Sequence, residues 1–180
     1  MKRNDLKKYT DHALKEGATS VKQIHPSSVV TAAWVRLKCQ FGCGGYNSSY
    51  CCPPHTPTEE ETRRVLDGYN RVLLFHIGTL PSKDRGKHLK KFFQILVDLE
   101  GDMFKDGYYK AFVYLAGPCH LCKECGKDKG ISCNHSDRAR PSMESCGIDV
   151  FQTARNSGFH IETLREETEP RNTFCLMMVD

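Results

Sequence analysis

The stretch YYKAFVYLAGPCHLCKEC, residues 108–125, joins an apolar run to a row of closely spaced cysteines. Its first nine residues are rich in aromatic and aliphatic side chains, which predicts a buried strand over 108–116. Three cysteines follow within the next nine residues. We therefore expect a cysteine-rich loop at the end of a strand, with a sheet holding that loop in place.

The rest of the chain alternates between helical and strand patterns. Apolar residues at helical spacing predict helices, one of which opens with a capping box formed by Thr58 and Glu61. The expected helices cover 4–16, 58–70, 87–104 and 141–158, and the other expected strands cover 29–38, 71–77 and 174–179. This order predicts an α/β or α+β fold with a central sheet flanked by helices. We expect residues 1–180 to form a single domain.

Charge and hydropathy exclude some classes of protein. The 26 basic and 22 acidic residues leave a formal charge of +4, too small to indicate a nucleic-acid partner. No apolar run approaches the length of a membrane span, and residues 1–22 lack the apolar stretch of a signal peptide. We therefore expect a protein of the reducing cytoplasm, where clustered thiols usually bind metals rather than form disulfides.

The second cysteine segment has the more specific spacing. Cys119, Cys122 and Cys125 are separated by two residues each, and Cys133 and Cys146 follow. A four-iron cluster needs one thiolate for each iron, so a compact loop can supply three ligands and a distant cysteine the fourth. Three adjacent thiols suit a single tetrahedral zinc ion less well, although zinc also accepts thiolates. The pattern favours an iron–sulfur cluster, with zinc as the alternative.

The first cysteine segment reads CQFGCGGYNSSYCCPP over residues 39–54. We expect Cys39, Cys43 and Cys52 to be ligands, because a proline follows Cys52 as it follows the closing ligand of ferredoxin motifs. Cys51 is interpreted as a spectator. Gly44 and the glycine after it are expected to allow positive φ angles and close approach of backbone amides to sulfur.

Two further cysteines lie in apolar surroundings. Cys146 falls within the expected helix 141–158, where it is either a core residue or a ligand; we favour a ligand, because each triad lacks a fourth thiolate. Cys175 lies in the apolar run 174–179, which predicts a buried core thiol.

These segments resemble the prokaryotic proteins of domain-of-unknown-function family 2284, described as predicted metal-binding proteins. The matching motifs are CQFGC at 39–43, CPP at 52–54, GPCHLCKEC at 117–125, RPSME at 140–144 and CGIDV at 146–150. The resemblance extends over nearly the whole chain and implies metal binding. The family is associated with anaerobic bacteria and archaea.

Eight cysteines match that pattern, which is the number that two [4Fe–4S] clusters use. They are Cys39, Cys43, Cys52, Cys119, Cys122, Cys125, Cys133 and Cys146. By analogy with ferredoxins, in which the last cysteine of a motif binds the other cluster, we expect Cys133 to join the first triad.

Three functions remain open: a small electron carrier or adapter, which we favour, a catalytic iron–sulfur protein with one open iron, and a zinc-binding structural module. No Ser-His-acid arrangement or substrate motif indicates an enzyme. Electron transfer implies a redox partner protein, and the oligomeric state stays open.

Polar residues near the second cysteine segment have two interpretations. They either tune a cluster or are ordinary polar residues of a loop: His120, His135, Arg138 and Arg140. Likewise Lys87, Lys90 and Lys91 form either a docking face or a solvated surface.

Overall fold

A four-stranded antiparallel sheet forms the centre of the structure, a computed structural model that describes residues 5–79, 83–166 and 168–180. The strands lie in the order β1, β2, β4, β3, and the longest pairing joins β2 to β4, with Phe75 opposite Cys175. Their bounds are β1 Ser20–Ile24, β2 Val72–Thr79, β3 Phe112–Tyr114 and β4 Arg171–Met178. The fold is therefore α+β, one of the two predicted classes.

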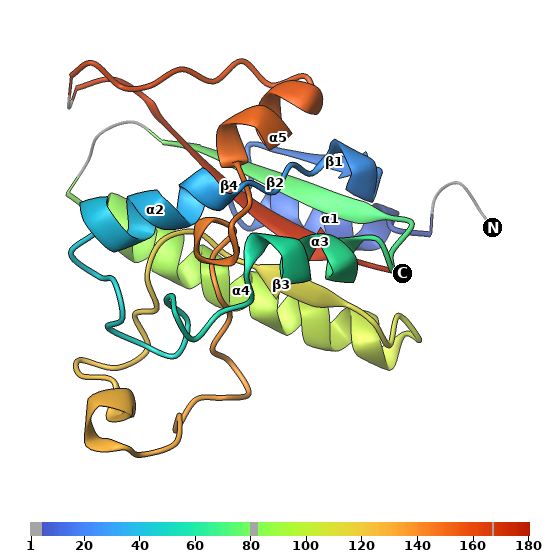
Figure 1. The fold of residues 1–180 in the computed structure, drawn as a ribbon. Coiled ribbons are helices and arrows are strands. Elements are labelled where there is room, and N and C mark those ends of the chain that lie inside the picture. Colours follow the sequence, from blue (N-terminus) through green and yellow to red (C-terminus); the bar gives the residue numbers. More distant parts are fainter. Residues whose placement is uncertain (1–4, 80–82, 167) are drawn as a thin grey trace.

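Both faces of the sheet are covered, which explains why the paired stretches 72–75 of β2 and 174–178 of β4 are continuously apolar. Alternate side chains such as Phe75 and Met177 pack against helices α1, Lys7–Lys15, and α4, Arg85–Lys105. The intervening side chains, such as Leu74 and Leu176, pack against α3, Glu59–Leu66, and α5, Val150–Asn156. Figure 1 shows the sheet held between these helices.

Several local predictions are confirmed. The helix expected over 4–16 is α1, with residue 4 outside the described part of the chain, and it is followed by Gly17 at a φ of 125°. The capping box is present, with Thr58 and Glu61 each accepting from the other's backbone N–H. That helix ends at Leu66 rather than at residue 70.

The strand predicted over 29–38 is wrong. A short 3₁₀ helix, Pro26–Ser28, is followed by helix α2, Ala33–Gly42, so Cys39 lies on a helix. Apolar and β-branched residues over 29–38 suggested a strand, but from Ala33 onward the chain is helical, and Val35 and Cys39 face the protein at helical spacing. The strand β1 was not expected.

The helix predicted over 141–158 is divided in two. A 3₁₀ helix, Glu144–Cys146, is ended by Gly147 at a φ of 75°, and α5 begins after Asp149, whose side chain accepts from Gln152 N. The strand predicted over 108–116 is shortened to β3. One cysteine loop leaves β3, as expected, whereas the other leaves a helix. Among the described residues, no helix is both long and apolar enough to cross a membrane.

Candidate metal centre

One group of thiols lies where α2 meets the 3₁₀ helix Glu144–Cys146. Cys39 is on α2, Cys43 caps its C-terminus, and Cys146 ends the 3₁₀ helix. The Cys39 thiol points toward the backbone oxygen of Glu144, with Sγ and O 3.9 Å apart. We call Cys39, Cys43, Cys52 and Cys146 the first thiol group.

Electrostatic coupling shows that these thiols are neighbours. Burial, together with nearby Cys43, Glu144 and Cys52, raises the pKa of Cys39. Burial raises the pKa of Cys146 to about 12, and Glu144 and Cys39 add to that rise. The structure thus brings the predicted first triad together and adds Cys146 to it, while Cys43 remains exposed.

Donors in the loop after α2 approach the sulfurs of the first thiol group. The backbone N–H of Gly45 donates to Cys43 Sγ over 3.4 Å, and the Ser49 hydroxyl donates to Cys52 Sγ over 3.3 Å. Such donors stabilise thiolates. The expected close approach of a glycine amide is present, but the positive φ angle belongs to Asn47, at 57°, and not to Gly44 or Gly45.

The second thiol group lines a cavity of about 150 Å³ between the loop 43–58 and the loop 117–140. Its members are Cys51, Cys119, Cys122, Cys125 and Cys133. The two loops are also joined by a hydrogen bond of 2.9 Å from the Tyr50 hydroxyl to the backbone oxygen of Ile131. In Figure 1 the loop 117–140, drawn in orange, extends well away from the sheet.

The Cys119 thiol of the second group is more acidic than a free thiol. A hydrogen bond from the Cys51 side chain lowers the pKa of Cys119 to about 6, against the effect of burial, and the Leu121 amide and His135 lower it further. The same interaction raises the pKa of Cys51. One thiolate is therefore available near neutral pH, and thiolates are the form that binds metals.

The structure distributes three cysteines differently from the prediction, since Cys146, which was expected to complete the second triad if Cys133 joined the first, lies with the first triad. Cys133 lies beside Cys51 and Cys122 in the second group, not with the first triad. Cys51, interpreted from sequence as a spectator, faces the second group while the adjacent Cys52 belongs to the first. Cys175 is fully buried in the core against α4 and α1, as predicted.

Glu144 is a residue of the first group's surroundings that the sequence analysis missed. Burial raises the pKa of its carboxyl, although hydrogen bonds from its own backbone and from Ser142 act in the opposite direction. Its Oε2 atom is buried and accepts no hydrogen bond from any described residue. The only sequence signal for it was its place in the RPSME motif, two residues before Cys146.

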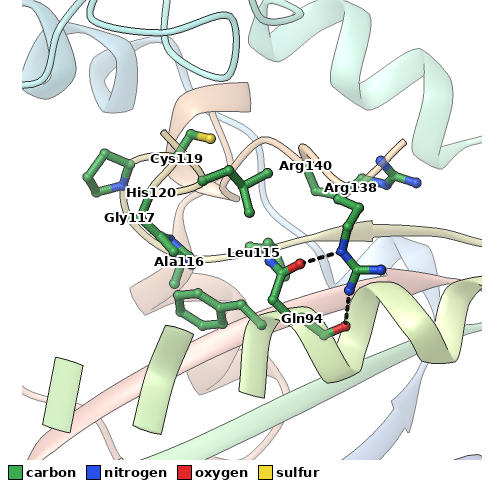
Figure 2. A pocket seen from close by; sticks show the side chains of 11 residues that line it. Gln94, Leu115, Ala116, Gly117, Cys119, His120, Arg138 and Arg140 are labelled. Atoms are coloured by element: carbon green, nitrogen blue, oxygen red, sulfur yellow. Dashed lines mark hydrogen bonds between the residues drawn. The ribbon is translucent and has the colours of Figure 1, made fainter. Parts of the chain in front are cut away.

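The base of the loop 117–140 is held against α4 around a pocket of about 10 Å³ (Figure 2). Arg138 Nε donates to Gln94 Oε1 over 2.7 Å, and the His120 ring lies 5.9 Å from that of Phe93. Burial lowers the pKa of His120, which favours the neutral form of its ring. Figure 2 shows the sulfur of Cys119 pointing away from Gln94, although Cys119 itself lines this pocket as well as the thiol cavity.

Arg140 is paired inside the protein. Its guanidinium donates to both carboxylate oxygens of Glu100 over 2.6–3.1 Å, and both side chains are nearly buried. Of the four residues proposed to tune a cluster, His135 lowers the pKa of a thiol, Cys119. The two arginines instead anchor the loop to α4.

In the described parts of the chain, no three His, Cys, Asp or Glu side chains lie close enough to hold one metal ion as they stand. The model of the family described as "Predicted metal-binding protein (DUF2284)" matches residues 22–179. No curated protein and no solved structure gives a significant match.

Proposed function

The chain belongs to this family of predicted metal-binding proteins, and from that premise we propose that it binds two [4Fe–4S] clusters and transfers electrons between them and a partner. The first cluster is bound by Cys39, Cys43, Cys52 and Cys146. The second is bound by Cys119, Cys122, Cys125 and Cys133. When bound, such clusters accept and donate single electrons.

The observation that carries this proposal is the gathering of nine thiols into two groups from distant segments. A four-iron cluster takes one thiolate per iron, and each group offers at least four. This favours fully ligated clusters, and therefore electron transfer, over a catalytic cluster with an open iron. A zinc module would need neither the number of thiols present nor their division into two groups.

The test is metal analysis of the protein purified without oxygen. We expect about eight irons and about eight sulfides per chain, because each four-iron cluster carries four of each. The variants Cys39→Ser and Cys122→Ser should each lower iron to about four per chain, since each removes a ligand of a different cluster. Cys175→Ala, which changes a core thiol outside both groups, is the matched control and should keep about eight.

Three outcomes would contradict the proposal. Stoichiometric zinc without iron would indicate the structural module. Four irons in the unmodified protein would indicate one cluster. Loss of all iron from both serine variants would show that the two groups form a single site.

A further inference from the structure

Helix α2 presents large apolar side chains to solvent. Trp34, Leu37 and Phe41 are 49%, 55% and 79% exposed. Their spacing places them in one stripe along the helix. Large side chains exposed together, rather than singly, mark interaction sites in soluble proteins.

The opposite face of the same helix carries Cys39 of the first thiol group. Val35 is buried, and Cys39, four residues later, faces the 3₁₀ helix Glu144–Cys146. Arg36 fixes this orientation by donating to the backbone oxygens of Pro57 and Ser145 over 2.8 and 3.0 Å. The stripe is therefore about one helix diameter, roughly 10–12 Å, from these thiols.

Along the sequence, the charge on α2 and its flanking segments has one sign. No acidic residue occurs between Glu16 and Glu59, a segment that includes all of α2 and the first cysteine segment. Lys38 is exposed and lies on the same side of the helix as Trp34 and Phe41, at spacings of four and three residues. A partner with an apolar centre and an acidic rim would complement this face.

We propose that the stripe Trp34, Leu37 and Phe41 is the docking site of a small acidic electron-transfer protein that exchanges electrons with the first cluster. This inference rests on the proposed function. It differs from the docking face considered from sequence at Lys87 and Lys90, which lie on α4.

The size of the stripe suits a transient complex better than a second copy of the chain. A stable interface uses about 20–30 residues from each partner, whereas electron-transfer complexes are smaller. Helix α2 has ten residues, and Val35 and Cys39 on its inner side are turned toward the protein. In a symmetric dimer formed through this face, Lys38 of one copy would also lie against the basic surface of the other copy, and like charges repel.

The experiment measures electron transfer from a reduced acidic ferredoxin, the probe, to the iron-loaded protein by stopped-flow absorbance. Phe41→Ala should lower the second-order rate about tenfold, the loss typical of an exposed aromatic residue at the centre of an interface. Lys38→Glu should lower it at low salt, and the rate of the unmodified protein should fall as salt rises.

Tyr109→Ala and Lys87→Glu are the matched controls, since both residues are exposed and belong to other segments than α2. Unchanged rates in these controls, with unchanged iron content in all variants, support the docking site. A Phe41→Ala rate equal to that of the unmodified protein overturns it, as does a dimer in sedimentation that Phe41→Ala dissociates. Absence of iron from the unmodified protein would instead reject the proposed function, independently of docking.

Discussion

The two thiol groups differ in what holds them in place. The first group is built on α2 and on the 3₁₀ helix Glu144–Cys146, and Cys146 lies in the core beneath the sheet. The second group lies mainly in the loop 117–140, whose only regular element is the 3₁₀ helix Gly126–Lys129. Folding of the chain therefore assembles the first group, whereas the second depends on a few anchors and, in our proposal, on its metal.

The largest expected effect comes from breaking the main anchor of the second group. Arg140→Ala should lower the free energy of unfolding by about 3–5 kcal/mol, because it leaves the Glu100 carboxylate buried without its ion partner. Urea unfolding measures the loss. Arg138→Ala removes an exposed pair with Asp98 and should cost about 1 kcal/mol or less.

A second variant separates charge burial from other causes. Arg140→Ala combined with Glu100→Gln should recover part of the stability, because no unpaired charge remains buried. Equal losses for Arg138→Ala and Arg140→Ala would show that burial of the pair is unimportant. A large change in cluster reduction potential for Arg140→Ala, with stability unchanged, would support the tuning role instead.

The next largest effect is expected from a substitution beside the first thiol group. A Cβ atom at Gly147 would lie 2.6 Å from Glu59 Cβ, and the φ angle of 75° is itself unfavourable for alanine. We expect Gly147→Ala to cost about 3 kcal/mol and to displace the adjacent Cys146. Gly117→Ala has a similar φ of 70° but no atom within 4 Å, so it should cost about 1–2 kcal/mol. Equal losses in thermal unfolding would contradict the packing argument.

Three strands of the sheet and most of the helices could be predicted because their patterns are local, whereas β1 was missed. The apolar runs around Phe75 and Leu176 and the capping box at Thr58 each lie within one element. Helix α2 could not be predicted in this way, because its apolar residues occupy both the inner and the exposed face. Such a helix lacks the polar outer side that normally reveals helical periodicity.

The cysteines show the same limit at the site. The spacing of Cys119, Cys122 and Cys125 indicated one group from local sequence alone. The positions of Cys133 and Cys146 depend on how the loop 117–140 folds back and on the turn at Gly147, which are tertiary features. Cys51 and Cys52 are adjacent in sequence and belong to different groups, so no spacing rule separates them.

Metal removal should expose the difference between the groups directly. After chelation of the iron-loaded protein, amide hydrogen exchange in residues 119–133 should speed up about 100-fold, because a bound metal stabilises that loop and little else does. Amides of α2 should change less than about tenfold, since tertiary packing holds that helix. Mass spectrometry of the exchanged peptides measures both. Similar changes in the two segments would mean that the groups are equally preformed.

The smallest expected effect concerns the fifth thiol of the second group. Cys51 donates a hydrogen bond to Cys119, and such a bond stabilises the more negative, reduced state of a cluster. Cys51→Ala should therefore lower the potential of the second cluster by about 40 mV, the equivalent of a hydrogen bond of about 1 kcal/mol in a one-electron couple. Cys51→Ser keeps a donor and should stay close to the unmodified protein.

Iron content separates this role of Cys51 from that of a ligand. About eight irons in Cys51→Ala, together with the lower potential, would identify a donor to a ligand. A fall to about four irons would make Cys51 itself a ligand and leave one of the four loop cysteines surplus. In that case the second site would share a continuous backbone link, Cys51–Cys52, with the first, and its assembly would depend on the rigid half of the protein.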